Sequence, residues 1–219
     1  MHTKNKFLMC LQPQELTLLE QKSTKVTYGK RETIVKKGEF STHFLLIHEG
    51  FVKVEMNEDG KNFILDIIPA GSIIGFPTLF NAEKHIFSTT SLTETVIQFI
   101  PIEIIRGIIE LNGKAALAAI KYSNETFVTP LLDKLQLMSH NNIKGRLAKL
   151  LLHFAVNTHR SNRFTLLINR TEIASMIGFS RENVIRVLSE FHAEGTISIK
   201  GKQLDILNVR KLEELTRNR

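Results

Sequence analysis

The side chains with the clearest chemical role lie in the stretch RTEIASMIGFSRENVIRVLS, residues 170–189. Ser180 can cap a helix that begins at Arg181, because its hydroxyl accepts a hydrogen bond from a free backbone N–H group. The first turns of this helix then present Arg181, Glu182 and Arg186 on an outer face. A guanidinium group can donate two hydrogen bonds to guanine, and a carboxylate can accept one from cytosine. The spacing therefore predicts a helix that reads base edges in duplex DNA.

The elements that position these side chains are two short helices joined by a tight turn. Asn169 followed by Glu172 is typical of a capping arrangement that begins the first helix. The residues expected to bury the two helices against each other, with one small residue at their closest approach, are Ile173, Ala174, Ile177, Gly178, Phe179, Val184 and Val187. This pattern predicts a helix-turn-helix.

A hairpin is predicted after the second helix, from two short strands at Thr196–Ile199 and Gln203–Leu207 around a Lys-Gly-Lys turn. Such a hairpin is the wing of a winged helix, and its tip lysines either bind phosphate or only increase solubility. The predicted DNA-binding residues are Thr171, Ser180, Arg181, Glu182, Asn183, Arg186, Lys200 and Lys202.

Charge is distributed unevenly along the 219 residues. Residues 1–139 hold 15 basic and 15 acidic side chains, which leaves 14 of the 29 basic and 7 of the 22 acidic ones in residues 140–219. The net charge of +7 therefore belongs to the last third of the chain. A local excess of Lys and Arg favours a polyanionic partner, because these side chains displace counterions from phosphates.

Several classes of protein are excluded. One cysteine, Cys10, rules out a disulfide framework, a zinc site built on paired cysteines and an iron–sulfur cluster. No glycine-rich phosphate loop or nucleophile motif indicates an enzyme. No apolar run approaches the roughly eighteen residues of a membrane helix. The apolar run at the start of the chain is too short for a signal peptide. We therefore expect a soluble, cytoplasmic protein that is not an enzyme.

The front of the chain indicates antiparallel β structure after a short helical segment at residues 7–22. Apolar and β-branched runs recur between turn signals: ETIVKKGE, HFLLIHEGFVKVEM, KNFILDII, GSIIGF, FSTTSLTE and TVIQFI. Asp59 and Gly60 are expected to form a hairpin turn, and the predicted corners are Gly38, Gly50, Gly71 and Gly75. The fold class is α+β: an N-terminal jelly-roll-like β-roll, a long helix and a C-terminal winged helix-turn-helix.

Helical periodicity begins at Ile102, with a short helix to about Asn112 and a long one from about Lys114 to Met138. Along the long helix, Leu117, Ile120, Asn124, Phe127 and Leu131 recur at spacings of three and four. This stripe either pairs with a second copy of the chain or packs on its own β-roll.

Three further features are expected around the long helix. Pro130 removes a backbone donor and should kink it. Residues 139–142, SHNN, are expected to form a hinge before a helix that buries Ile143, Leu147, Leu150, Leu151 and Phe154. A strand should follow at Phe164–Ile168.

In this order of parts the chain resembles the cyclic-AMP receptor protein and fumarate/nitrate regulator (CRP/FNR) family of bacterial transcription factors. The most specific stretches are GRLAKLLL (145–152), EIASMIGFSRENVIRVL (172–188) and PAGSIIG (69–75). The resemblance implies a sensor domain at residues 1–112, a dimerisation helix at 113–139 and a DNA-binding domain at 140–219. It also implies a homodimer on a palindromic operator, contact with RNA polymerase, and a small-molecule effector. Arg181, Glu182 and Arg186 match the Arg-Glu-x-x-x-Arg pattern of the cyclic-AMP branch.

The predicted effector pocket departs from that branch. Cyclic-nucleotide binders carry a glutamate for the ribose after the turn glycine, and an Arg-Ser pair for the phosphate. Here Phe76 follows Gly75, His85 and Ile86 stand in place of the pair, and no arginine occurs between residues 84 and 105. Burying a phosphate without such donors is unfavourable. The candidate pocket residues are Gly71, Gly75, Phe76, Pro77, His85, Ile86, Leu131 and Leu132.

With these residues in the pocket, we do not expect cyclic AMP to be the effector. The sequence does not identify the effector. The pocket either holds an apolar ligand, holds a haem with His85 as a ligand, or is filled by the protein's own side chains. An isolated histidine is more often solvated than ligating. The alternative function is a ligand-sensing module whose winged helix binds protein rather than DNA.

Overall fold

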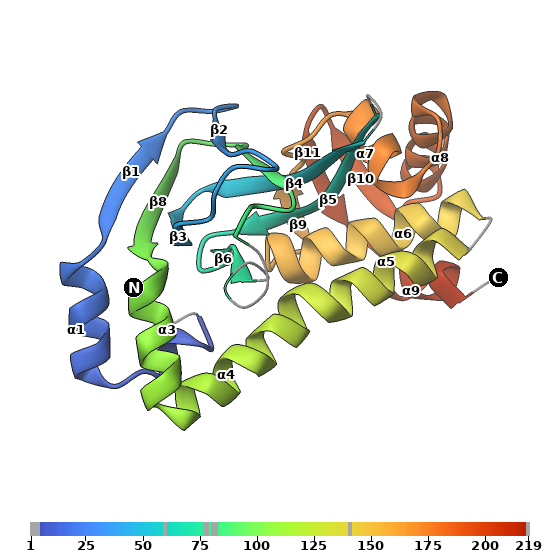
Figure 1. Ribbon diagram of the computed structural model, residues 1–219. Coiled ribbons are helices and arrows are strands. Elements are labelled where there is room, and N and C mark those ends of the chain that lie inside the picture. The colour runs from blue at the N-terminus through green and yellow to red at the C-terminus, as the bar shows by residue number, and fades with distance from the viewer. Residues whose placement is uncertain (1–4, 59–60, 77–78, 80–82, 140–141, 218–219) are drawn as a thin grey trace. The chain divides into compact units, whose positions relative to one another are not determined.

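The computed structural model describes residues 5–58, 61–76, 79, 83–139 and 142–217. The chain divides into two compact units, one of residues 1–59 with 67–131 and one of residues 60–66 with 132–219. Figure 1 shows the elements of each unit.

The strands that precede α3 form two four-stranded sheets, with strand orders β1-β8-β3-β6 and β2-β7-β4-β5. In the first sheet β8 lies between β1 and β3 and is antiparallel to both. The strands are β1 (Thr24–Tyr28), β2 (Thr33–Val35), β3 (His43–Glu49), β4 (Phe51–Glu58), β5 (Lys61–Pro69), β6 (Ile73–Ile74), β7 (Ser88–Ser91) and β8 (Thr95–Pro101). The predicted β-roll is therefore confirmed.

Glycine makes the sharp corners of the roll possible. The run predicted as HFLLIHEGFVKVEM is two strands, β3 and β4, separated by Gly50, whose φ is +89°. A Cβ at Gly50 would lie 2.5 Å from the backbone oxygen of Glu94, so only glycine fits. The other predicted corners, Gly38, Gly71 and Gly75, also have positive φ. The Asp59–Gly60 turn lies outside the described residues.

Strand β1, with the sequence TKVTY, was not predicted. Four of its five residues are exposed and the fifth is half-buried, so no apolar alternation marks it. It forms because Thr24 to Tyr28 pair with Phe99 to Thr95 of β8.

Helices close one end of the roll. The short helical turn η2 (Leu8–Cys10) and helix α1 (Pro13–Gln21) precede β1, and α3 (Ile102–Leu111) follows β8, with α1 beside α3 in Figure 1. The core cluster here includes Phe7, Phe44, Phe76, Ile105 and Tyr122, each less than 10% exposed.

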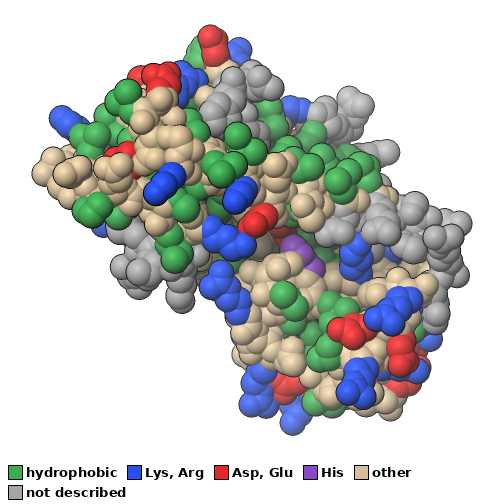
Figure 2. Space-filling model, turned by 90° about the horizontal axis from the view of Figure 1, so that it is seen from below, with side chains coloured by type: hydrophobic (Ala, Val, Ile, Leu, Met, Phe, Trp, Pro, Cys, Tyr) green, Lys and Arg blue, Asp and Glu red, His purple; other side chains and the backbone are tan. Residues whose placement is uncertain are grey.

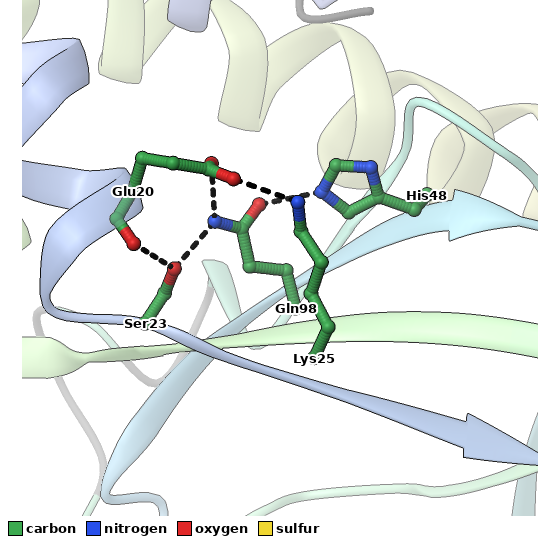
Figure 3. A network of polar contacts seen from close by, with 5 residues as sticks. All are labelled: Glu20, Ser23, Lys25, His48 and Gln98. Carbon is green, nitrogen blue, oxygen red and sulfur yellow. Dashed lines mark hydrogen bonds and ion pairs between the residues drawn. The ribbon is translucent and has the colours of Figure 1, made fainter.

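A polar network attaches the end of α1 to the sheet (Figure 3). Gln98 on β8 is only 1% exposed, and its Nε2 donates to Glu20 Oε2 at 3.0 Å and to Ser23 Oγ at 2.6 Å. His48 Nε2 lies 2.6 Å from Gln98 Oε1, and Lys25 Nζ lies 2.7 Å from Glu20 Oε1. Each polar atom of the Gln98 amide therefore has a partner, which makes its burial tolerable.

A continuous helical run joins α4 (Gly113–Ser123), a π-helical turn η3 (Asn124–Val128) and α5 (Thr129–Ser139). The sequence predicts a kink in the helix at Pro130. The structure has the wider π-helical turn η3 shortly before this proline. In the turn, Thr129 N–H donates to Asn124 O, one residue further back than in an α-helix. Proline cannot donate and crowds the preceding turn, so a π turn accommodates it without ending the helix.

The second unit contains a three-stranded sheet of order β10-β11-β9 and several helices. Its elements after α5 are α6 (Ile143–His153), η4 (Phe154–Thr158), β9 (Arg163–Thr165), α7 (Arg170–Ile177), α8 (Arg181–Ala193), β10 (Ile197–Lys200), β11 (Gln203–Ile206) and α9 (Val209–Arg217). Residues 140–141 of the predicted hinge lie outside the described residues, and Asn142 caps α6 by accepting from Lys144 N.

Two details of this unit differ from the sequence analysis. Strand β9 is three residues long and begins at Arg163, before the predicted start. Helix α9 was not predicted, because its polar sequence contains few apolar residues. It forms against α6, where Leu212 is fully buried and a Cβ at Gly145 would lie 2.9 Å from Leu215 O. No helix in the described part of the chain is both long and apolar enough to span a membrane.

Candidate nucleic-acid interface

The turn between α7 and α8 has the local structure that the sequence predicts, with one correction. Asn169 Oδ1 accepts from Glu172 N, and Glu172 Oε2 accepts from Asn169 N, both at 2.9 Å, which is a capping box. Gly178 adopts φ +71° and ends α7 as a left-handed cap, which confirms the predicted tight turn, although Gly178 itself is exposed rather than buried between the helices. Ser180 then caps α8 by accepting from Asn183 N at 3.3 Å.

Helix α8 has two distinct faces. Its inner face consists of Val184, Val187, Leu188 and Phe191, each 3% exposed or less. Its outer face presents Arg181, Glu182, Ile185 and Arg186, all exposed, with Asn183 half-buried at their edge. The structure therefore brings the predicted base-reading side chains together at the first two turns of one helix.

Arg186 and Lys144 share a carboxylate that the sequence analysis did not identify. Arg186 Nη1 lies 2.5 Å from Glu190 Oε1, and Lys144 Nζ of α6 lies 2.8 Å from Glu190 Oε2. The hydrogen bond from Lys144 lowers the pKa of Glu190 and raises the pKa of Lys144, so both groups are charged at neutral pH. Glu190 thus orients Arg186 along α8 before any base is contacted.

A buried arginine braces the turn and was also missed. Arg146 on α6 is only 8% exposed, its Nη1 donates to Ile177 O at 2.8 Å, and its guanidinium lies 4.9 Å from the ring centroid of Phe179. Burial lowers the pKa of this guanidinium. The carbonyl it binds is in the last turn of α7, where helical carbonyls lack partners. Arg146 therefore fixes the turn that sets the start of α8.

The predicted wing is confirmed as the antiparallel pair β10 and β11, in which Lys200 lies opposite Gln203. Lys200 and Lys202 are exposed on either side of Gly201, whose φ is +61°. Thr171 is exposed in the first turn of α7. These three side chains are accessible to a phosphate backbone.

The candidate effector residues fall into separate environments. Phe76 is 2% exposed and packs against Phe7, Phe44 and Tyr122, with ring centroids 5.6, 5.3 and 5.0 Å away. Gly71 and Gly75 form left-handed corners of the turn before it. Pro77 lies outside the described residues.

His85 and Ile86 belong to a different surface, a hollow of about 580 Å³. The other residues that line it are Lys37, Gly38, Met56, Glu83 and Lys84. His85 is 4% exposed, and burial lowers its pKa against an opposing effect of Glu39. Its Nδ1 has no hydrogen-bond partner among the residues that the structure describes. No three His, Cys, Asp or Glu side chains gather there or elsewhere in the described chain as a metal site requires.

The apolar stripe on the helical run reaches the surface. Leu117, Ile120 and Leu131 are 53, 56 and 46% exposed, while Phe127 is half-buried and the polar Asn124 is exposed. Leu132, which like Leu131 is a candidate pocket residue, is 59% exposed. The surface seen in Figure 2 likewise exposes hydrophobic side chains between Lys and Arg side chains. Large exposed apolar side chains in a row are typical of an interaction surface.

Comparisons with known proteins support both the β-roll and the helix-turn-helix. A family model described as a Crp-like helix-turn-helix domain matches residues 145–215. A model described as a cyclic nucleotide-binding domain matches residues 25–112. The fumarate and nitrate reduction regulatory protein of Vibrio cholerae is 27% identical over 195 residues, which covers 85% of this chain and 76% of that protein.

Two further similarities extend over most of the chain. The CRP-like cAMP-activated global transcriptional regulator of Mycobacterium tuberculosis is 24% identical over 219 residues and 94% of each protein. The structure of FixK2 from Bradyrhizobium japonicum has a TM-score of 0.79 at 20% identity, covering 88% of this chain and 96% of that one.

Proposed function

We propose that this chain, which belongs to the CRP/FNR family of DNA-binding transcription regulators, binds a palindromic operator as a homodimer. Each protomer of the dimer inserts its helix α8 into one half-site. The observation that carries this proposal is the outer face of α8, where Arg181, Glu182 and Arg186 are exposed above a buried apolar face. The family consists of regulators rather than enzymes. RNA polymerase is the expected protein partner of the complex on DNA.

Sequence reading follows from the chemistry of these three side chains. Each arginine can donate a pair of hydrogen bonds to O6 and N7 of a guanine, and Glu182 can accept from a cytosine amino group. The half-sites should therefore be rich in G·C pairs and resemble the TGTGA type of the cyclic-AMP branch, with Ile185, 39% exposed, modifying the preference. Lys200 and Lys202 supply phosphate contacts that do not depend on sequence.

The first prediction is that Arg181→Ala costs about 1–3 kcal/mol at one base pair of each half-site and relaxes selectivity there. Lys200→Ala is the matched control, since it removes a positive charge of the wing and should weaken all duplexes alike. Selection from random duplexes, followed by affinity measurements on single-base variants, checks both. Equal weakening of specific and random DNA by Arg181→Ala would mean that Arg181 only contacts phosphate.

The alternative function is that of a ligand-sensing module whose winged helix binds protein rather than DNA. It is supported by the same architecture but leaves the exposed Arg-Glu-x-x-x-Arg face without a role. Affinity for duplex DNA that falls steeply with salt concentration distinguishes the two, because counterion release accompanies phosphate binding.

The effector of the sensor unit is proposed to be something other than cyclic AMP. The residues do not fit a cyclic nucleotide, because Phe76 is enclosed by aromatic rings and His85, rather than an arginine, lies at the predicted phosphate position. The residue types are compatible with a haem, with an apolar ligand, or with a pocket that the protein's own side chains fill.

The second prediction is that cyclic AMP produces no saturable heat in titration calorimetry up to about 1 mM, and that operator binding is unchanged by it. The physical reason is that a buried phosphate needs a guanidinium or several aligned donors. Binding at micromolar concentrations would overturn this assignment of the pocket residues.

A further inference from the structure

The first described residues of the chain are buried in the sensor unit. Phe7, Leu8 and Leu11 are 0, 2 and 7% exposed, and the polar Asn5 is only 3% exposed. These four side chains of the segment Asn5–Leu11 therefore enter the core although no strand or long helix carries them.

Asn5 ties the segment to the turn that precedes Phe76. Its Oδ1 accepts from Phe7 N at 3.0 Å and from Leu8 N at 3.1 Å, while its Nδ2 donates to Gly71 O at 2.7 Å. Both ends of the amide are thus occupied. On the other side of the segment, α1 is attached to the sheet through the Glu20–Gln98 network of Figure 3.

The ring of Phe7 completes an aromatic cluster that includes helix α4. It lies 6.0 Å from Phe44 and 5.6 Å from Phe76 in an edge-to-face arrangement, and Phe76 lies 5.0 Å from Tyr122 of α4. The hydroxyl of Tyr122 accepts from Ile73 N at 3.0 Å, and burial raises the pKa of this hydroxyl, which keeps it neutral. At the outer edge, Lys6 Nζ lies 2.6 Å from Glu125 of the adjoining π turn.

This cluster joins three parts of the unit: the N-terminal segment, the turn at residues 71–76, and α4. In the resembling cyclic-nucleotide binders, the position of Phe76 carries the glutamate that holds the ligand's ribose. Here Phe76 contacts a ring supplied by the chain itself.

We propose that the segment Asn5–Leu11 acts as a ligand in cis, in which Phe7 occupies an aromatic-binding site formed by Phe44, Phe76 and Tyr122. The segment holds α4 against the β-roll in place of an effector, so the protein needs no small molecule for operator binding. The same site accepts a small uncharged aromatic molecule when the ring of Phe7 is removed. The DNA-binding part of this inference rests on the proposed function.

The class of ligand follows from the surroundings of Phe7. The ring of Phe7 contacts the rings of Phe44 and Phe76, and the edge-to-face geometry with Phe76 suits another aromatic ring. An apolar cavity left by deleting a buried ring stays dry and binds benzene-sized molecules. An anionic or strongly polar compound would gain no partner there.

The test uses Phe7→Ala in the full chain with toluene as the probe. We expect Phe7→Ala to bind operator DNA about tenfold or more weakly, because a smaller fraction of molecules is in the binding-competent state. Toluene should restore most of this loss and raise the melting temperature of the variant. Phe40→Ala is the matched control, since Phe40 is a phenylalanine of the same roll that is 67% exposed. Toluene should change neither that control nor the wild type.

A second variant, Asn5→Ala, releases the segment without removing a ring of the site. It too should lose DNA affinity and regain it with toluene. If Phe7→Ala shows no cooperative melt, the appearance of one on adding toluene supports the proposal, and its continued absence overturns it. Wild-type DNA affinity in Phe7→Ala, or a loss that toluene does not reverse, also overturns it.

The melting experiment contains no DNA and therefore separates the two proposals. If the wild type fails to bind duplex DNA, the proposed function is wrong, while a toluene-dependent rise in the melting temperature of Phe7→Ala still establishes the aromatic site. If the wild type binds DNA but toluene never stabilises Phe7→Ala, only the cis-ligand proposal fails.

Discussion

Replacing Ile120 and Phe127 together with glutamate should convert the protein from a dimer to a monomer and weaken operator binding by a hundredfold or more. Ile120 is 56% exposed in the stripe of apolar side chains along α4 and α5, and a second copy of the chain is the proposed cover for this stripe. Two carboxylates placed there meet their symmetry mates across the interface. The loss of affinity for DNA is large because two linked recognition helices bind about 10²–10⁴ times more tightly than one.

Analytical ultracentrifugation at micromolar concentration measures the oligomeric state, and fluorescence anisotropy with a labelled operator measures affinity. Lys121→Glu is the matched control, because it places a carboxylate at the exposed neighbour of Ile120 on the same helix. It should remain dimeric. A wild-type monomer under these conditions would contradict the prediction, and the stripe would then have another role.

Arg146→Ala should destabilise the winged helix by about 2–5 kcal/mol, since a hydrogen bond to a charged donor contributes about 1.5–3 kcal/mol and a cation–π contact about 0.5–2 kcal/mol. The substitution leaves Ile177 O without the donor that lies 2.8 Å from it and removes the guanidinium that stacks on Phe179. The turn that sets the start of α8 is then no longer braced. Operator affinity should fall together with stability.

Urea unfolding followed by circular dichroism checks the stability change. Arg210→Ala, an exposed arginine on α9 of the same unit, is the matched control and should change stability little. Arg146→Lys should recover only part of the loss, because an ammonium group cannot reproduce the planar, forked guanidinium. Unfolding of Arg146→Ala at the same urea concentration as the control would show that the contacts of Arg146 contribute nothing measurable.

The parts of the protein that were predictable from sequence depend on neighbours a few residues apart. The capping box at Asn169, the cap at Ser180 and the left-handed glycines of the roll each act within about four residues. The apolar spacing that buries Val184, Val187 and Leu188 is likewise one helical turn long. These local preferences agree with one another, which is why the sequence alone predicts the helix-turn-helix and its outward arginines.

Features that escaped prediction are those for which the partner lies far away in the chain. Strand β1 has no apolar alternation and exists through pairing with β8, about seventy residues later. Arg146 is an unremarkable basic residue until α6 places it against the turn at Ile177, 31 residues on. Phe7 belongs to a short apolar run that indicates only a helical start, yet it completes a cluster with Phe44 and Phe76.

The candidate pocket shows the same division. Residue types alone argue against a phosphate site, because the absence of an arginine between residues 84 and 105 can be read directly from the chain. The sequence does not predict where Phe76 and His85 lie, because adjacent segments of a roll can face different surroundings. Phe76 lies in an aromatic core, and His85 lines a surface hollow. Burial is a property of the assembled sheets and helices, and a sequence specifies it only where short-range periodicity already marks an inner face.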